Sequence, residues 1–383
     1  MNVLGVMSGT SLDGLDAVLV RFEGGGDAPL AWEIVARASE PYEGPLRERL
    51  VAAIRPGGAD VVELTRLHAE VGERVADLVQ RLQRDGASID LVAMSGQTVW
   101  HEPRVEDAPG ARVPSTLQIG EPSRVVARCD LPVASDLRQG DLAEGGQAAP
   151  MVSFGDWMLF GRAGVARAVQ NLGGIANLTW LPPDGDPERV RAFDTGPSNC
   201  LLDELADAGL GRPFYEDGRV AATGRVDEAV LARLMDHPYL RLAPPKTTGR
   251  EEFNLRELAA TGLPALPVAD ALATAVAYTV ASVADAYRRW VVPDGLDEVL
   301  LAGGGARNPR IVDGLRRELG ALGADVRTFE EIGLRSSDRE AVAFALMGYE
   351  LWHRRPNVLP AATGARRAAI SGRLGFPVAT PRT

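Results

Sequence analysis

The chain has 383 residues, enough for two domains; 45% of them are hydrophobic and 24% are charged, as is typical of a globular protein. The formal net charge is −11 and no basic tract occurs, which argues against nucleic acid or an anionic membrane surface as the main partner. The N-terminus lacks a charged segment followed by a long apolar one, and no apolar stretch approaches about 18 residues, so we expect no signal peptide, no membrane span and a cytoplasmic location. Cys129 and Cys200 suggest neither a disulfide framework nor a metal cluster, and we expect buried thiols.

The first part of the chain predicts three strands joined by short turns, followed by alternating helices and strands. The expected strands are residues 2–7, 15–22, 32–38, 89–96, 116–120 and 131–135, and the expected helices are residues 45–54, 59–84 and 121–129. In residues 59–84 the apolar side chains recur at near-helical spacing. A meander followed by strand–helix alternation indicates a mixed sheet with a parallel portion.

The second part of the chain repeats this order of elements. Its expected elements are a helix at 151–160, a hairpin at 165–181, a strand at 189–196, helices at 198–209 and 268–290, a strand and glycine turn from 297, a helix from 309, a strand at 324–329 and a helix at 338–353. The duplication predicts the α/β class, with two lobes around a cleft, each a mixed sheet flanked by helices. We expect the lobes at 1–135 and 136–383, with the tail after 354 returning to the first lobe or lying in an interface.

Three glycine-rich loops share one physical property. Their glycines allow positive φ, and the missing side chain lets backbone N–H groups come close to phosphate oxygens. The first is MSGTSLDG, where the hydroxyls of Ser8, Thr10 and Ser11 add donors and Asp13 could hold a hydrated Mg²⁺. The second is QNLGGIANL and the third is LLAGGGARNP. Each loop alone is more often structural, but three on a duplicated frame favour a nucleotide site.

Lysine usage excludes two common nucleotide-binding classes. Lys246 is the only lysine in the chain, and it follows a proline, so no Gly-Lys-Ser/Thr motif of a P-loop exists. A protein kinase would need a lysine in a Val-Ala-x-Lys strand, which is also missing. Any ATP site in this chain must therefore rely on hairpin amides and a metal ion.

The motifs together resemble one family. GVMSGTSLDGLDAVL, GQTVWHEP, QIGEP, GGQAAP, QNLGGIANLTWL, FDTGPSN, PPKTTGREEFN and LAGGGARNP occur in the order seen in anhydro-N-acetylmuramic acid kinases, from Gly5 to about Gly375. The resemblance implies the duplicated ribonuclease H-like fold of the actin–hexokinase–Hsp70 superfamily. It also implies ATP-driven conversion of 1,6-anhydro-N-acetylmuramic acid and water to N-acetylmuramic acid 6-phosphate and ADP, in cell-wall recycling, by a homodimer.

Asp194 is the expected catalytic base. It ends an apolar strand and precedes a turn, so it should project into the cleft with limited solvation, and burial would raise its pKa. The family's catalytic aspartate lies in the same motif. The alternative is that Asp194 is a turn former or N-cap for the helix that begins near Ser198.

The resemblance also implies the remaining site residues. The residues expected to bind ATP are Gly9, Thr10, Ser11, Leu12, Asp13, Gly14, Leu15, Asp16, Gly173, Gly174, Asn177, Gly303, Gly304, Gly305 and Asn308. Asp13 is the expected Mg²⁺ ligand, unless it only caps a tight turn. Gln97, Thr98 and Glu340 are expected to contact the sugar, although Glu340 could be an exposed acid at a helix N-terminus. His101 is as compatible with a loop hydrogen bond as with a substrate contact.

Lys246 and Arg250, in PPKTTGREEFN, carry a separate hypothesis. A lone lysine among 41 basic residues suggests that a point charge is wanted there, and we expect this loop to contact a substrate carboxylate or phosphate. Alternatively, Arg250 merely pairs with Glu251 or Glu252 on the surface.

Two positions depart from the family pattern. Ser95 stands where a histidine is usual before Gly-Gln-Thr, and Ser198 replaces the usual glycine of the aspartate motif. The first change puts in doubt any role of that histidine in substrate contact. Two other functions stay open: an ordinary sugar hydroxyl kinase, and a nucleotide-gated binding protein of actin or chaperone type.

Overall fold

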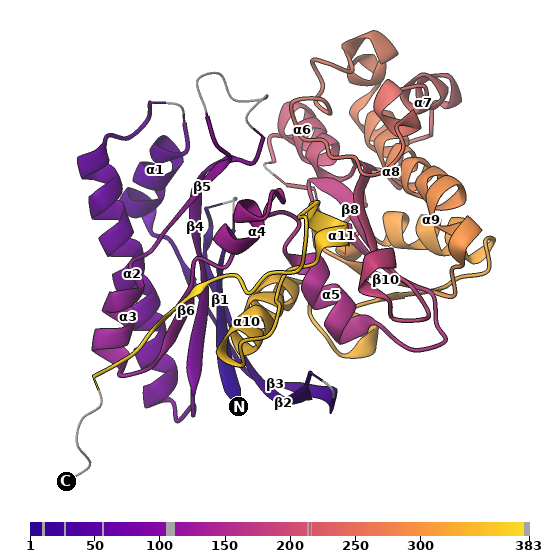
Figure 1. The fold of residues 1–383 in the computed structure, drawn as a ribbon. Helices are drawn as coiled ribbons and strands as arrows, with labels where there is room; N and C mark the ends of the chain where they lie inside the picture. Colours follow the sequence, from indigo (N-terminus) through magenta and orange to yellow (C-terminus); the bar gives the residue numbers. More distant parts are fainter. Residues whose placement is uncertain are drawn as a thin grey trace. The chain divides into compact units, whose positions relative to one another are not determined.

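The computed structural model describes residues 1–9, 12–26, 28–55, 57–104, 112–212, 214–215 and 217–378. Within it the chain forms two compact units, drawn in Figure 1. Unit 1 comprises Met1–Leu159 and Ser337–Thr383, and unit 2 comprises Phe160–Ser336. The division differs from the expected boundary at 135, and the returning segment begins at 337, earlier than the expected tail after 354.

Unit 1 is built on one mixed sheet with helices packed against it. Its strands are β1 (Asn2–Ser8), β2 (Gly14–Gly25), β3 (Ala28–Pro41), β4 (Leu91–Glu102), β5 (Ser115–Ile119), β6 (Val133–Ser135) and β12 (Arg373–Gly375). They run in the order β12-β6-β4-β1-β2-β3, with β5 added to β4. β1, β2 and β3 are antiparallel, whereas β4 is parallel to β1 and β6 is parallel to β4.

The helices of unit 1 are α1 (Gly44–Ala53), α2 (Val61–Arg84), α3 (Pro122–Cys129), α4 (Gln139–Ala143), α5 (Val152–Phe160), α10 (Arg339–Trp352) and α11 (Pro360–Thr363). α10 is buried along most of its length and packs against β1. The backbone approach is so close that a Cβ on Gly5 would lie 1.9 Å from the carbonyl oxygen of Ala341. Glycine is therefore required at this point of β1.

Two contacts assign α5 to unit 1, which explains why the expected boundary was wrong. Gly155 of α5 lies against α10, since a Cβ there would be 2.7 Å from the Cβ of Ala343. The carboxylate of Asp156 accepts hydrogen bonds from the guanidinium of Arg339, and both side chains are buried. The chain therefore completes α5 on the first sheet before it enters unit 2.

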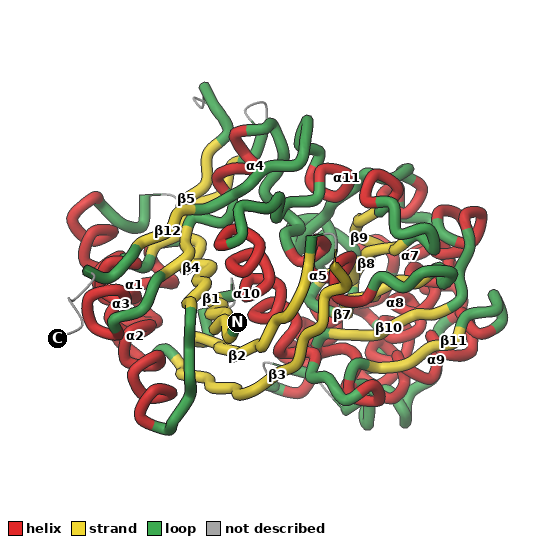
Figure 2. Tube along the Cα trace, turned by 60° about the horizontal axis from the view of Figure 1, so that its bottom comes forward, coloured by secondary structure: helices red, strands yellow, loops and turns green. Residues whose placement is uncertain are grey.

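Unit 2 repeats the topology of unit 1. Its strands are β7 (Arg167–Leu172), β8 (Ile175–Leu181), β9 (Arg191–Pro197), β10 (Glu298–Ala302) and β11 (Asp325–Thr328), and its helices are α6 (Asn199–Leu210), α7 (Glu228–Met235), α8 (Val268–Trp290) and α9 (Pro309–Gly320). The order β9-β8-β7-β10-β11 matches β3-β2-β1-β4-β6, with the same antiparallel and parallel pairs. Figure 2 shows these strands in yellow, and the predicted duplication is confirmed.

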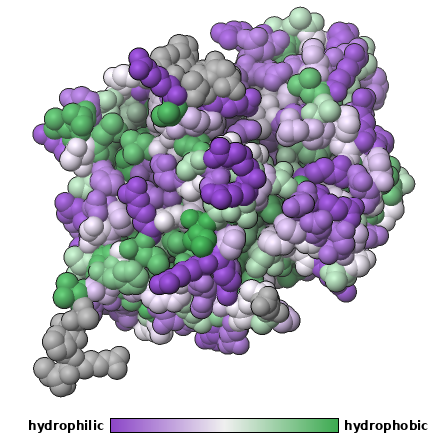
Figure 3. All heavy atoms as spheres, in the orientation of Figure 1, coloured by the Kyte–Doolittle hydropathy of each residue, from purple (hydrophilic) through white to green (hydrophobic). Residues whose placement is uncertain are grey.

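The core of unit 2 surrounds α8, whose buried side chains include Leu272, Tyr278, Val283 and Tyr287. The segment Val268–Asp294 is long and apolar enough to cross a membrane by length and composition alone. However, 67% of its most apolar window is buried inside the protein, as expected of a core helix. On the face seen in Figure 3, hydrophobic residues (green) form small groups among hydrophilic ones (purple).

Candidate active site

The loop between β1 and β2 of unit 1 contains the first predicted phosphate-binding residues. Thr10 and Ser11 lie outside the described residues. Leu12 is buried and has a φ of 57°, and its N–H donates to the carbonyl of Gly9 over 3.2 Å. Its own carbonyl accepts from Nε of Arg47 over 3.1 Å. Leu12 is thus a left-handed residue held by hydrogen bonds at both its N–H and its carbonyl.

A buried polar network beneath the loop holds it in place. The hydroxyl of Ser8 lies 2.7 Å from that of Tyr42 and donates to Oε1 of Gln97 over 2.5 Å. The amide nitrogen of Gln97 donates to the carbonyl of Gly9 over 3.1 Å. Burial raises the pKa of Tyr42 to about 12, so its hydroxyl stays protonated. Gln97 has no exposed surface, and its hydrogen bonds favour a role in holding the loop; its direct contact with the sugar stays a prediction.

Carboxylates gather at the end of this hairpin. Asp13 is exposed, and its Oδ1 lies 3.7 Å from Nη2 of Arg47. Burial raises the pKa of Asp16, and the nearby carboxylates of Asp338 and Asp13 raise it further. Arg37 and Arg47 pair with Asp338 and Asp13, and Mg²⁺ at this end of the hairpin stays a prediction. No group of three or more acidic, histidine or cysteine side chains among the described residues could hold a metal ion alone, so water and phosphate oxygens would supply the other ligands.

The other predicted sugar contacts of unit 1 lie on different elements. Thr98 is half-buried on β4, and its hydroxyl accepts from Gln118 over 3.3 Å. Glu340 is exposed in the first turn of α10. His101 pairs with the hydroxyl of Thr116 at 2.9 Å, and burial lowers its pKa. This contact supports the loop hydrogen bond that we considered for His101.

Ser95, the first departure from the family pattern, has a structural role. Its hydroxyl accepts from the N–H of Ser8 over 3.1 Å and donates to the carbonyl of Gly96 over 3.0 Å. Beside it is a cavity of about 410 Å³ that is also lined by His68 and Glu121. The serine therefore ties β4 to the phosphate hairpin.

The second hairpin, between β7 and β8 in unit 2, connects directly to the start of α6. The carbonyl of Gly174 accepts from the N–H groups of Ser198 and Cys200, and that of Gly173 accepts from Asn199, each over 3.0 Å. Ser198 is the N-cap residue, and its buried hydroxyl has no hydrogen-bond partner among the described residues, so the hairpin carbonyls and not this side chain bind the start of α6. Asn177 follows the turn on β8 and lies opposite Asp194 of β9 in the antiparallel strand register.

The third glycine loop follows β10 and packs onto the end of β7. Gly303 has a φ of 88°, and a Cβ there would lie 2.6 Å from Oδ1 of Asn171. A Cβ on Gly305 would lie 2.8 Å from that of Leu172, whereas Gly304 is less crowded. Asn308 caps α9 by accepting from the N–H of Arg310, and its buried Nδ2 has no hydrogen-bond partner in the part of the chain that the structure describes. The structure therefore brings the second and third glycine loops together within unit 2.

Asp194 is half-buried near the end of β9. Its Oδ2 accepts from the N–H of Thr248 over 2.9 Å, and its backbone carbonyl accepts from the hydroxyl of Tyr239 over 2.9 Å. Burial raises the pKa of Asp194 to about 6, and the Thr248 N–H and Lys246 oppose this shift. Because the carboxylate binds residue 248 and not the start of α6, the alternative role as a helix cap is excluded.

In the loop that carries Lys246 and Arg250, the lysine is buried and the arginine is exposed. Lys246 is buried, with only 6% of its surface exposed, and its ammonium donates to the carbonyls of Tyr239 and Leu240. This placement corrects the expectation of a cation free to contact substrate. Arg250 is exposed, and a Cβ on Gly174 would lie 3.4 Å from its Nη2. Within the described residues, Arg250 forms no ion pair with Glu251 or Glu252, so its guanidinium remains available beside the second hairpin.

Two residues of this site were missed from the sequence. Tyr239 lies in a short helical turn, Pro238–Arg241, that no motif marks. Glu252 accepts from the hydroxyl of Thr248 over 2.6 Å and lies 3.9 Å from Nδ1 of His237. The motif PPKTTGREEFN pointed to the segment of Glu252 but did not distinguish its role.

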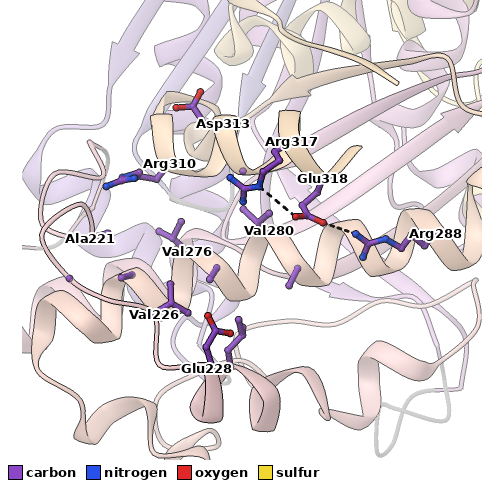
Figure 4. Close-up of a pocket in the computed structure, with 16 residues that line it drawn as sticks. Ala221, Val226, Glu228, Val276, Val280, Arg288, Arg310, Asp313, Arg317 and Glu318 are labelled. Atoms are coloured by element: carbon purple, nitrogen blue, oxygen red, sulfur yellow. Dashed lines mark hydrogen bonds and ion pairs between the residues drawn. The ribbon is translucent and has the colours of Figure 1, made fainter. Parts of the chain in front are cut away.

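A separate groove of about 530 Å³ lies among α7, α8 and α9 (Figure 4). Its floor includes Val276 and Val280, and its rim carries the ion pair between Arg288 and Glu318, at 2.6 Å. None of its lining residues is a predicted site residue. Within unit 2, the second and third glycine loops and Asp194 are therefore the candidate site residues, and this groove is lined by other residues.

Comparison with known proteins identifies the class as a sugar kinase, an enzyme that uses ATP. A family model described as anhydro-N-acetylmuramic acid kinase matches residues 1–377, and the chain belongs to this family. The chain is 35% identical over 384 residues to the anhydro-N-acetylmuramic acid kinase of Bacillus thuringiensis subsp. konkukian, covering 98% of this chain and 100% of the relative. It is 39% identical over 384 residues to the enzyme of that name from Salinibacter ruber, covering 98% and 96%.

Two solved structures are similar at low identity. A ROK family glucokinase from Streptomyces griseus, in complex with glucose and AMPPNP, is 14% identical and has a TM-score of 0.39, with 91% of this chain and all of that chain covered. A ROK hexokinase from Thermus thermophilus is 14% identical and has a TM-score of 0.35, with 91% and 99% covered.

Proposed function

We propose that this protein hydrolytically opens 1,6-anhydro-N-acetylmuramic acid and phosphorylates O6 with ATP, giving N-acetylmuramic acid 6-phosphate and ADP. The observation that carries the proposal is Asp194, a half-buried carboxylate with a pKa of about 6, in a chain whose relatives are named for this substrate. A base of that pKa is ionised in most molecules at neutral pH and is a stronger proton acceptor than an ordinary aspartate.

In the proposed reaction, one carboxylate oxygen of Asp194 accepts a proton from water. The water oxygen forms a bond to the anomeric carbon on the face opposite the bridging oxygen, and the bond between C1 and O6 breaks. O6 then takes the γ-phosphoryl group and ADP leaves. The N–H of Thr248 binds Oδ2 of Asp194, which leaves Oδ1 for the water.

The phosphates of ATP are proposed to bind the hairpin amides. In unit 1 these are the residues from Gly9 to Asp16, and in unit 2 the turn Gly173–Gly174, with Arg250 beside it. Gly303, Gly304, Gly305 and Asn308 are proposed to receive the adenosine. Mg²⁺ held with Asp13 would neutralise charge on the phosphates. Thr98 and Glu340 stay proposed sugar contacts.

The wider setting is also a proposal. The substrate places the enzyme in the recycling of cell-wall sugars, in the cytoplasm, where ATP is available. We propose a homodimer, which size-exclusion chromatography with light scattering can test.

The test uses the sugar, ATP and ¹⁸O-labelled water, comparing the wild type with Asp194→Asn. Sugar-dependent ADP release with label at the anomeric position, lost in the variant, supports the hydrolytic kinase and its base together. Sugar-dependent ADP release without label would instead indicate an ordinary hydroxyl kinase. ATP hydrolysis that is indifferent to the sugar would overturn the substrate assignment.

A further inference from the structure

Asp194 is held at three points by one short stretch of chain. Its backbone N–H donates to the carbonyl of Lys246 over 3.1 Å, its carbonyl accepts from the hydroxyl of Tyr239, and its Oδ2 accepts from the N–H of Thr248. Residues 239–248 thus fix both the backbone and the carboxylate of Asp194. A carboxylate bound in this way is restricted to one orientation.

The ammonium of Lys246 binds the same stretch of chain. Its ammonium donates to the carbonyls of Tyr239 over 3.3 Å and Leu240 over 3.4 Å, and its Nζ lies 4.7 Å from the centre of the Tyr239 ring. The ring therefore offers its negative face to the cation while its hydroxyl holds Asp194. One side chain, Tyr239, links the two charged residues.

Burial makes the charged form of Lys246 unfavourable. Among the described residues, no carboxylate lies within ion-pair distance of its ammonium, and burial lowers its pKa. Burying a cation without a counterion is unfavourable, and an apolar side chain of similar length would avoid that penalty. Support of the turn alone would therefore not account for a buried cation at this position.

We propose that Lys246 and Tyr239 are positioning residues for Asp194: the tyrosine hydroxyl fixes the backbone of the base, and the buried ammonium, bound to the same turn, supplies a positive charge near its carboxylate. This inference rests on the proposed function, because it takes Asp194 as the base. It replaces our sequence-based hypothesis that Lys246 contacts the substrate.

Other charged groups around Asp194 and Lys246 do not supply the same field. Asp285 and Arg289 of α8 act on Lys246 with opposite signs, and they are paired with each other at 2.8 Å. Glu252 is negative and bound to Thr248, and His237 lies beside it with a pKa lowered by burial. Lys246 is the cation that opposes the rise in the pKa of Asp194.

The experiment compares Lys246→Met and Tyr239→Phe with the wild type. The pKa of the Asp194 carboxyl is measured by ¹³C NMR in the free protein, with Asp194→Asn to assign the signal. In Lys246→Met we expect this pKa to rise by about one unit, because a nearby cation favours the carboxylate. kcat at pH 6.5 should fall about threefold and recover at pH 8.5, while KM for the sugar stays within about twofold.

Tyr239→Phe keeps the ring that faces the ammonium and removes only the hydroxyl. We expect kcat to fall about tenfold at every pH, with the pKa of Asp194 unchanged, because orientation and not charge is lost. The matched control is Arg241→Met, which removes an exposed cation from the same turn, where it pairs only with Asp236. That control should leave kcat, KM and the pKa of Asp194 unchanged.

Two results would overturn the inference. A rise of more than about tenfold in KM for sugar or ATP in Lys246→Met, with the pKa of Asp194 unchanged, would restore a substrate contact. No effect of either variant on kcat or on this pKa would mean a purely structural role. The NMR titration needs no substrate, so a failure of the proposed function, seen as a wild type inactive on the anhydro sugar, remains distinguishable.

Discussion

The carboxylate of Asp156 and the guanidinium of Arg339 form a two-point ion pair, with Oδ1 2.8 Å from Nε and Oδ2 bound to Nη2. The two side chains are 1% and 6% exposed. They lie 183 residues apart in sequence, next to the two places where the chain passes between unit 1 and unit 2. The pair therefore fastens the last helix before unit 2 to the first helix after it.

The first prediction concerns this ion pair. Arg339→Met should lower the free energy of unfolding of the protein by about 3–5 kcal/mol, because it leaves a buried carboxylate without its partner. The double variant Asp156→Leu/Arg339→Met should be less destabilised than Arg339→Met, since no buried charge remains. Urea unfolding of the wild type, the single variant and the double variant measures both effects. Equal losses in the single and double variants would contradict an ion-pair role.

The second prediction concerns the pH dependence of catalysis. In the proposed reaction Asp194 acts as a carboxylate, and burial raises its pKa to about 6. kcat/KM for the sugar should therefore be level above about pH 7 and fall about tenfold for each pH unit below about pH 5.5. A pH–rate profile measures this limb. An acid limb near pH 4 would show that Asp194 has an ordinary pKa or is not the base.

The third prediction is that Asp194→Asn stabilises the protein while abolishing its activity. The folded-state pKa of Asp194, about 6, lies above the ordinary value of 3.8, so the protonated form is favoured by folding. At pH 8 the carboxylate disfavours folding, by up to about 3 kcal/mol for this shift, and below about pH 4 the penalty is absent. The variant should therefore gain stability in urea unfolding at pH 8 and lose that gain as the pH falls through 6 toward 4. An equal stability difference at both values would contradict the raised pKa.

The fourth prediction separates steric crowding from backbone strain at the third glycine loop. Gly303 and Gly323 have φ values of 88° and 96°, but only Gly303 has neighbours within 4 Å of an added Cβ. Gly323→Ala should reduce the free energy of unfolding by about 1–2 kcal/mol through strain alone. Gly303→Ala should reduce it by at least about 2 kcal/mol more and should weaken binding of a fluorescent ATP analogue, because Leu172 and the loop must move apart. Equal effects would mean that the loop tolerates the methyl group.

Local patterns in the sequence were enough to predict most of the fold. The two strand meanders and the long helices α2, α8 and α10 follow from alternation, spacing and glycine turns. The boundary between the units differs from the expected one because α5 has no distinct polar face, so its sequence does not say which sheet it joins. α7 and the short turn Pro238–Arg241 were missed, since they lie in a region rich in loop-forming residues.

The sequence pointed to residues of the candidate site, but not to the role of each residue. Asp194 and the glycines stand in recognisable motifs, whereas Gln97 and Lys246 are polar side chains whose burial is decided only by the folded chain. Gln97 binds Ser8, 89 positions away, and Asp194 binds Thr248, 54 positions away. Only the assembled sheet decides whether such a side chain faces the ligand or supports a loop, so the sequence alone favoured the exposed role for both.

The last prediction tests this difference for Gln97. Replacing it by leucine removes one hydrogen bond each from the carbonyl of Gly9 and the hydroxyl of Ser8, at about 0.5–1.5 kcal/mol per bond, and loosens the loop that precedes Asp13. KM for ATP should rise about tenfold while KM for the sugar changes by less than about twofold. Gln80→Leu is the matched control, because Gln80 also donates from its amide to a backbone carbonyl, that of Arg128 on α3, and is not part of the site. A rise confined to KM for the sugar would restore the direct sugar contact, since a loop-holding residue would weaken ATP binding first.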